Sequence, residues 1–97
     1  MYRDKVCVVI GGAVGAGKKA VEKMAAEGGI VAFMDTDKEA GCRLRDELIE
    51  QYCGDVWFFH GDAASEEDIE IFTAAVNGQF GEIDYLVNHV PSRAFMI

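Results

Sequence analysis

The sequence predicts an α/β fold: a doubly wound parallel sheet, truncated to about four strands in the order 3-2-1-4, with three helices. Two observations predict it. Short apolar runs, rich in β-branched residues, alternate along the chain with segments whose apolar residues recur at helical spacing. A glycine-rich segment, Gly11–Gly17, also stands between the first apolar run and the first amphipathic segment. Such an alternation gives parallel strands joined by right-handed helical crossovers.

The first predicted unit is a strand, a glycine turn and a helix. Lys5–Ile10 is a nearly continuous β-branched run, which is typical of a strand buried on both faces. Apolar residues at helical spacing over 20–25 predict a helix, and Gly28-Gly29 is expected to close it. The second strand, Ile30–Met34, then ends at Asp35.

The second predicted helix follows directly. Thr36 and Glu39 form a capping-box pattern, in which Thr36 is the N-cap and Glu39 reaches back. Leu44 and Leu48 lie on one apolar stripe, and Gly54 is expected to end the helix.

The remaining elements are a third strand, a third helix and a fourth strand. Val56–Phe59 is the third strand, and its aromatic residues, Trp57 included, are expected in the core. The acidic stretch after Ser65 suits a helix N-terminus, and the buried face of that helix comprises Ile69, Phe72, Val76 and Phe80. Ile83–Val90 is the fourth strand, which Pro91 discourages from continuing.

Composition limits the classes of protein to which the chain can belong. Its 97 residues suffice for one domain, 1–97, with one hydrophobic core. Nine basic and seventeen acidic residues give a net charge of −8, which argues against a nucleic-acid surface or a polybasic membrane patch. The early apolar run is too short for a signal peptide or a membrane span.

Three cysteines, Cys7, Cys42 and Cys53, lack metal-ligand spacing. On one helix, Cys42 and Cys53 would lie about 16 Å apart, too far for a disulfide. A reducing, cytoplasmic location fits them best.

The glycine turn has two functional interpretations, besides that of a connection without a ligand. Gly11, Gly15 and Gly17 have the spacing G-x-x-x-G-x-G of a dinucleotide turn, in which backbone amides and a helix N-terminus hold phosphate. Gly12, Gly17 and Lys18 also satisfy most of a phosphate-binding loop for ATP. However, Lys19 stands where that loop needs a hydroxyl for Mg²⁺, which disfavours the ATPase interpretation.

Asp35 supports the dinucleotide interpretation. It follows Gly17 by eighteen positions, close to the spacing of the carboxylate that binds the adenosine ribose. A carboxylate there would repel a 2′-phosphate, and neither position 36 nor position 37 is Arg or Lys. NAD is therefore favoured over NADP, although Lys18 and Lys38 are close enough in sequence to approach a phosphate.

These residues together resemble the first half of a classical short-chain dehydrogenase/reductase. Ile10–Gly17 matches the glycines of the family motif T-G-x-x-x-G-x-G, with Ile10 in place of Thr, and Asp35 matches the acidic residue for NAD preference. His60-Gly61-Asp62-Ala63 resembles the stretch that contacts adenine, and Ile83–Asn88 resembles the strand leading into the N-N-A-G signature.

The resemblance implies a partial, Rossmann-like NAD-binding domain. It implies a cofactor site made of residues in the glycine turn and at the ends of the second, third and fourth strands: Gly11, Val14, Gly15, Ala16, Gly17, Asp35, Thr36, Asp62, Ala63 and Asn88. It also implies an oxidoreductase that transfers hydride between a nicotinamide cofactor and an alcohol or carbonyl substrate.

The sequence departs from the family pattern in two places. His89, Val90 and Pro91 replace the last three residues of N-N-A-G. No tyrosine is followed by lysine four positions later, as the family's catalytic Tyr-x-x-x-Lys requires. We therefore expect these 97 residues to bind cofactor and to be inactive alone.

Two other function classes stay open, a non-catalytic nucleotide-binding or assembly module and a phosphoryl-transfer protein. A metal site at His60 and His89 is disfavoured, since the two residues end different strands and do not form an H-x-x-x-H pair. The apolar fourth strand has no later partner in the sequence, so we expect a homo-oligomer formed through this strand or its flanking helices.

Overall fold

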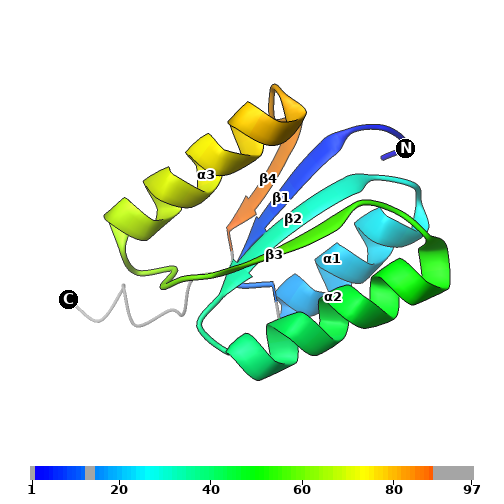
Figure 1. Ribbon diagram of the computed structural model, residues 1–97, viewed down its shortest axis with the longest axis horizontal. Helices are drawn as coiled ribbons and strands as arrows, with labels where there is room; N and C mark the ends of the chain where they lie inside the picture. Colours follow the sequence, from blue (N-terminus) through cyan, green and yellow to red (C-terminus); the bar gives the residue numbers. More distant parts are fainter. Residues whose placement is uncertain (1, 13–14, 89–97) are drawn as a thin grey trace.

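The computed structural model describes residues 2–12 and 15–88. Strands and helices alternate along it in the order β1 (Val6–Ile10), α1 (Gly15–Ala26), β2 (Ile30–Asp35), α2 (Lys38–Tyr52), β3 (Val56–His60), α3 (Glu66–Phe80) and β4 (Tyr85–Asn88). Figure 1 shows the sheet between α3 on one side and α1 and α2 on the other.

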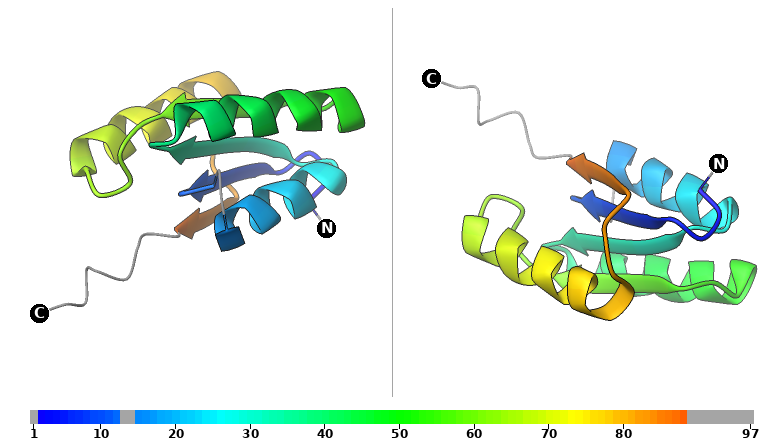
Figure 2. Two further views of the ribbon diagram at one scale, coloured as in Figure 1. Left: turned by 90° about the horizontal axis from the view of Figure 1, so that it is seen from below. Right: turned by 90° about the horizontal axis from the view of Figure 1, so that it is seen from above.

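The four strands form one parallel sheet in the order β3-β2-β1-β4, as predicted. Figure 2 shows the strand arrows running in the same direction. The pairing of β1 with β4 joins segments that are far apart in sequence. Val6 N–H donates to Asp84 Oδ2 (2.8 Å), and Asp84 N–H donates to the Val6 carbonyl (2.9 Å), which fixes the start of β4 against β1.

Both faces of the sheet are covered, which explains the nearly continuous apolar run of β1. On one face, Cys7 and Val9 pack with residues of α1 and α2, including Leu44 and Leu48. On the other face, Val6, Val8 and Ile10 pack with Phe72 and Val76 of α3. Every residue of β1 is buried, as predicted for a strand covered on both faces, and Cys7 is fully inaccessible.

The helix ends agree with the sequence at α1 and α3 but not at α2. Ser65 is the N-cap of α3, accepting from the Asp68 N–H (3.2 Å), and Gly28 ends α1 with a left-handed φ of 85°. For α2 the prediction of Thr36 as N-cap is wrong. The N-cap is Asp37, whose side chain accepts from the Ala40 N–H at 3.0 Å.

The predicted end of α2 is also displaced. The helix stops at Tyr52, and Cys53, not Gly54, takes the left-handed conformation with φ 55°. Its N–H reaches the Ile49 carbonyl at 2.8 Å and so satisfies a group that the helix end leaves open.

Trp57 is not in the core, contrary to expectation. Trp57 is 38% exposed because β3 is an outer strand of the sheet. The ring of Phe80 packs edge-on against it, with the ring centroids 4.9 Å apart.

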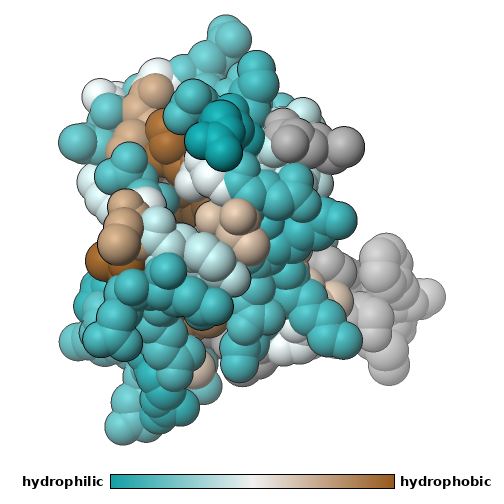
Figure 3. All heavy atoms as spheres, turned by 90° about the vertical axis from the view of Figure 1, so that its right-hand side faces the viewer, coloured by the Kyte–Doolittle hydropathy of each residue, from teal (hydrophilic) through white to brown (hydrophobic). Residues whose placement is uncertain are grey.

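Within the described residues, no helix is long and apolar enough to cross a membrane. Figure 3 views the side on which the N-terminus lies, where small apolar areas are surrounded by hydrophilic residues.

Candidate functional site

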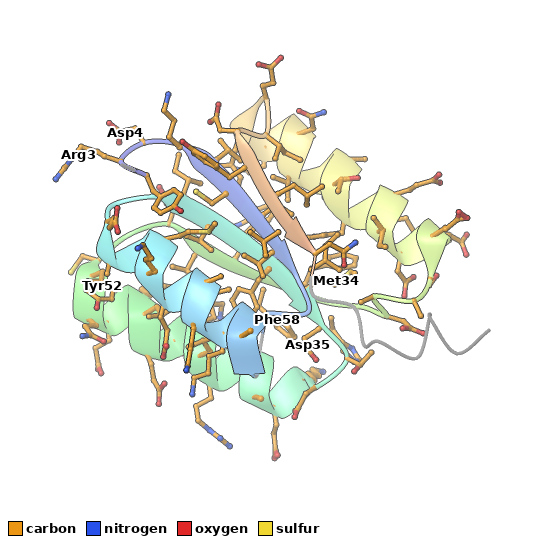
Figure 4. All side chains as sticks on the ribbon, turned by 180° about the vertical axis from the view of Figure 1, so that it is seen from behind. Arg3, Asp4, Met34, Asp35, Tyr52 and Phe58 are labelled. Atoms are coloured by element: carbon orange, nitrogen blue, oxygen red, sulfur yellow. The ribbon has the colours of Figure 1, made fainter. Side chains whose placement is uncertain are left out.

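The register of the sheet brings the ends of all four strands to one edge. Ile10 pairs with Met34 on one side and with Asn88 on the other, and Asp35 pairs with His60. Figure 4 shows Asp35 at the opposite end of the sheet from Arg3 and Asp4. The glycine turn, Asp35, the His60–Ala63 segment and Asn88 therefore share the carboxyl edge, where open α/β sheets bind ligands.

The glycine turn is bound to the end of β2. The Gly11 N–H donates to the Met34 carbonyl (2.7 Å), and the Gly12 N–H reaches the same oxygen at 3.2 Å. Gly11 has a φ of 84°, and Gly15 a φ of 62°, conformations that side-chain-bearing residues rarely adopt. Gly11 and Gly12 are thus held directly beside the end of β2.

Gly17 lets α1 approach this turn closely. A Cβ at Gly17 would overlap the carbonyl oxygen of Gly11, and it would lie 3.1 Å from Gly12 Cα. A Cβ at Gly12 would lie 2.9 Å from side-chain atoms of both Val21 and Phe33. The turn therefore has the tight backbone packing that a dinucleotide phosphate cradle requires.

Helix α1 begins at Gly15, at this edge of the sheet. Gly15 and Ala16 are exposed, and the first turn of the helix has no acidic residue. Unpaired N–H groups and the positive end of the helix dipole favour an anion there. Val14, the remaining predicted residue of the turn, lies outside the described residues.

Asp35 is held in a tight turn between β2 and α2. Its Oδ1 accepts from the Asp37 N–H at 3.0 Å, which is an Asx-turn, and its backbone carbonyl accepts from the Gly61 N–H at 3.1 Å. Because Asp37 in turn caps α2, the orientation of the Asp35 carboxylate is tied to the start of that helix.

His60 contacts the same turn from the neighbouring strand. Its Nε2 lies 3.1 Å from the backbone oxygen of Thr36, twenty-four residues earlier in the chain. Both residues are exposed. The sequence indicated only a strand-end histidine, since nothing in the local pattern shows which group it meets across the sheet.

The loop after β3 is organised by two carboxylates. Asp62 Oδ1 accepts from the Ala64 N–H (2.8 Å), and the Asp62 N–H donates to Asp68 Oδ2 (2.9 Å). Ala63 packs, partly buried, against the α3 side of the core. Asp68 was predicted only as helix-terminal charge, and its bond to the Asp62 backbone makes it a support of the loop as well.

Asn88 ends β4 beside Ile10 and is exposed. The three residues that follow it, which replace the rest of the N-N-A-G signature, lie outside the described residues. Within 2–12 and 15–88, no three His, Cys, Asp or Glu side chains gather in a group that could hold a metal ion.

Cys7 contributes no nucleophile to this edge. It is buried in β1, and burial, with a smaller effect from the charge of Asp84, raises the pKa of its thiol to about 11. The thiol is therefore protonated at neutral pH and acts as a core side chain.

Comparison with known proteins shows the family to which this chain belongs. The family model for short chain dehydrogenases matches residues 5–93. The chain is 39% identical over 87 residues to a 3-beta-hydroxysteroid dehydrogenase of Comamonas testosteroni, covering 90% of this chain and 33% of that protein. It is 28% identical over 94 residues to the short-chain dehydrogenase/reductase homolog YusS of Bacillus subtilis (strain 168), covering 91% of this chain and 86% of that protein.

Solved structures show the same fold. L-sorbose reductase from Gluconobacter frateurii, complexed with NADPH and L-sorbose, superposes with a TM-score of 0.87 at 26% identity, over 93% of this chain and 34% of that one. NAD⁺-bound xylitol dehydrogenase superposes with a TM-score of 0.80 at 28% identity, over 88% of this chain and 32% of that one. The chain thus spans about a third of the length of these enzymes, and the two carry different nicotinamide cofactors.

Proposed function

This chain belongs to the short-chain dehydrogenase family, and from that premise we propose that it is the NAD-binding part of an oxidoreductase acting on an alcohol or carbonyl substrate. It has the nicotinamide-cofactor-binding, Rossmann-like fold of that family.

The observation that carries the proposal is the fixed carboxylate of Asp35 beside the glycine turn. The Asp37 N–H orients Asp35 at the end of β2, and the glycine turn bonds to Met34, the residue before it. A carboxylate at this point accepts hydrogen bonds from ribose hydroxyls and repels a 2′-phosphate. Both effects favour NAD.

The remaining roles follow from position along the carboxyl edge. The pyrophosphate would lie over the glycine turn and the N-terminus of α1, which involve Gly11, Val14, Gly15, Ala16 and Gly17. The adenosine half would lie over Asp35, Thr36, Asp62 and Ala63, and Asn88 would meet the cofactor farther along the edge. The fit rests on Gly17, where a Cβ would overlap the Gly11 carbonyl oxygen, and on Gly12, where a Cβ would meet the side chains of Val21 and Phe33.

The bound cofactor would supply a hydride acceptor or donor at its nicotinamide ring. None of the three tyrosines of this chain is followed by a lysine four positions later. We propose that these 97 residues bind and orient the cofactor and that the general acid for hydride transfer is not among them.

A titration with NADH and with NADPH, followed by the fluorescence of the reduced nicotinamide, tests the proposal without needing activity. NADH is expected to bind more tightly. Asp35→Asn removes the charge and leaves an oxygen to accept from the Asp37 N–H, so it should narrow the gap between the two cofactors by about tenfold, the effect of one charge-assisted hydrogen bond. Glu50→Gln, an exposed change elsewhere on α2, is the matched control and should leave the gap unchanged.

Equal affinities for NADH and NADPH in the unchanged protein would remove Asp35 from the ribose role. Binding of neither cofactor would contradict the proposed function of the chain. If ATP with Mg²⁺ bound more tightly than NADH, the result would favour the phosphoryl-transfer alternative.

We further propose that the protein associates as a homo-oligomer through β4. This strand is the last of the described sheet on the β1 side, and its Leu86 is 57% exposed and its Tyr85 38% exposed. An apolar outer strand with open backbone groups favours pairing with a second copy, in a two-fold arrangement. A reducing compartment such as the cytoplasm suits the three cysteines, all of which are free thiols.

A further inference from the structure

We propose that His60 is a positioning residue for cofactor selectivity, because it bonds the backbone of the turn that presents Asp35. This inference rests on the proposed function. It assigns a selectivity role to a side chain that touches the turn and not the cofactor.

The geometry gives His60 a specific partner. Its Nε2 lies 3.1 Å from the Thr36 oxygen, and Thr36 is the central residue of the Asp35–Asp37 turn. A backbone carbonyl only accepts hydrogen bonds, so Nε2 must carry the proton and donate. Nε2 carries a proton in the imidazolium and in one neutral tautomer, so the contact does not require a charged ring.

The contact completes a set of bonds around a turn of three residues. Asp35 Oδ1 is bonded to the Asp37 N–H, the Asp35 carbonyl to the Gly61 N–H, and the Thr36 carbonyl to His60. The first bond closes the turn on itself, and the other two attach it to the end of β3. Since Gly61 is the residue after His60, the two attachments act together on consecutive carbonyls.

The orientation of Thr36 matters because its peptide separates the carboxylate of Asp35 from the amide that orients it. If the Thr36 carbonyl loses its partner, the peptide between Thr36 and Asp37 can rotate, and the Asp37 N–H turns away from Asp35 Oδ1. A less fixed Asp35 carboxylate holds ribose hydroxyls less well and opposes a 2′-phosphate less well. Removing the His60 donor should therefore weaken NADH binding more than NADPH binding.

Two substitutions at one position separate the donor from mere packing. His60→Leu keeps an apolar body and removes the donor, whereas His60→Gln places an amide N–H near the former Nε2. Gln51→Leu is the matched control, because it puts the same residue at an exposed site near the end of α2 remote from the turn. Each variant is titrated with NADH and NADPH, and its unfolding is followed in urea.

The expected result for His60→Leu is an NADH affinity lower by about threefold to tenfold, the worth of one net hydrogen bond, and a smaller NADH-to-NADPH ratio. His60→Gln should restore the ratio to within about twofold, and Gln51→Leu should leave it unchanged. The amide resonance of Asp37 should shift in His60→Leu and return in His60→Gln, which reports on the turn without any cofactor.

An unchanged ratio in His60→Leu, with NADH still bound by the unchanged protein, would overturn this inference and leave the proposed function standing. An equal loss for NADH and NADPH, with a matching loss of stability and no rescue by glutamine, would show a structural role only. Binding of neither cofactor by the unchanged protein would reject the proposed function, and this inference with it.

Discussion

Replacing Gly17 by alanine should test whether the close approach of α1 to the glycine turn is required. The new Cβ would overlap the Gly11 carbonyl oxygen and lie 2.9 Å from the Gly11 carbonyl carbon. These are backbone atoms, so they cannot rotate away as a side chain would. Overpacking costs about 1–3 kcal/mol, and the better helix propensity of alanine returns about 1 kcal/mol. With the upper cost, the free energy of unfolding should fall by about 2 kcal/mol.

The chain offers a matched control for this substitution. Gly78 also lies in a helix, α3, and a Cβ there would meet nothing within 4 Å. Gly78→Ala should therefore raise the free energy of unfolding by up to about 1 kcal/mol, so the two alanine variants should differ by about 3 kcal/mol. Urea unfolding followed by far-ultraviolet circular dichroism measures both.

Gly17→Ala should also lose NADH binding, because relieving the overlap moves the turn or the start of α1. Gly78→Ala should bind NADH as the unchanged protein does. A Gly17→Ala protein that is stabilised like Gly78→Ala and binds NADH normally would refute the claim that the turn depends on this contact.

Three further predictions concern other parts of the molecule. Burial raises the pKa of the Cys7 thiol from 9.0 to about 11. The stability that the buried neutral thiol contributes is therefore complete below pH 9 and is lost as the pH rises through 11. The free energy of unfolding, measured in urea, should be lower at about pH 10.5 than at about pH 8, and the difference should be smaller in Cys7→Ala. Gly41→Ala should destabilise the protein by up to about 2 kcal/mol, because the overlap of its Cβ with the Phe58 ring costs about 1–3 kcal/mol and the better helix propensity of alanine returns about 1 kcal/mol. Combining it with Phe58→Leu should reduce the overlap penalty; additive losses in urea unfolding would contradict this contact. Leu86→Asp on the exposed face of β4 should dissociate the proposed oligomer, which light scattering at micromolar concentration would detect; a monomer before substitution would reject the oligomer.

The sequence was sufficient where the determining contacts are local. The start of α3 could be predicted from the acidic stretch after Ser65, and the cap that Ser65 forms there is equally local, since its partner, the Asp68 N–H, lies three residues away. The strand order also followed from local signals, since the alternation of strands with helices and the glycine turn leave few topologies.

At the start of α2 two local interactions compete, and the sequence could not rank them. Thr36 and Asp37 are both good N-caps. The Asx-turn of Asp35 uses the Asp37 N–H, which keeps Asp37 outside the helix and leaves it as the cap. The helix therefore begins at Lys38, one residue later than a Thr36 cap would place it.

Features that depend on distant residues were missed for a physical reason. The sequence predicted Trp57 to be a core residue because it lies in a strand rich in aromatic residues. It is exposed because β3 is the outer strand of the sheet. The bond between His60 and Thr36 spans twenty-four positions and requires β2 and β3 to be in their native register. No spacing rule within either strand predicts the contact between His60 and Thr36.

The pairing of β1 with β4 has a consequence for how the chain is made. Val6 and Asp84 are 78 positions apart, whereas each helical crossover links strands that are near neighbours in sequence. At about 5–20 residues per second, a ribosome needs roughly 4–16 s between synthesising the two, so β1 stays open on one side during that time. The three strands β1–β3 and their two connecting helices have all been synthesised by then and can fold locally, and contacts of such long range form late. On the growing chain, the glycine turn and Asp35 can thus meet before the strand bearing Asn88 is in place.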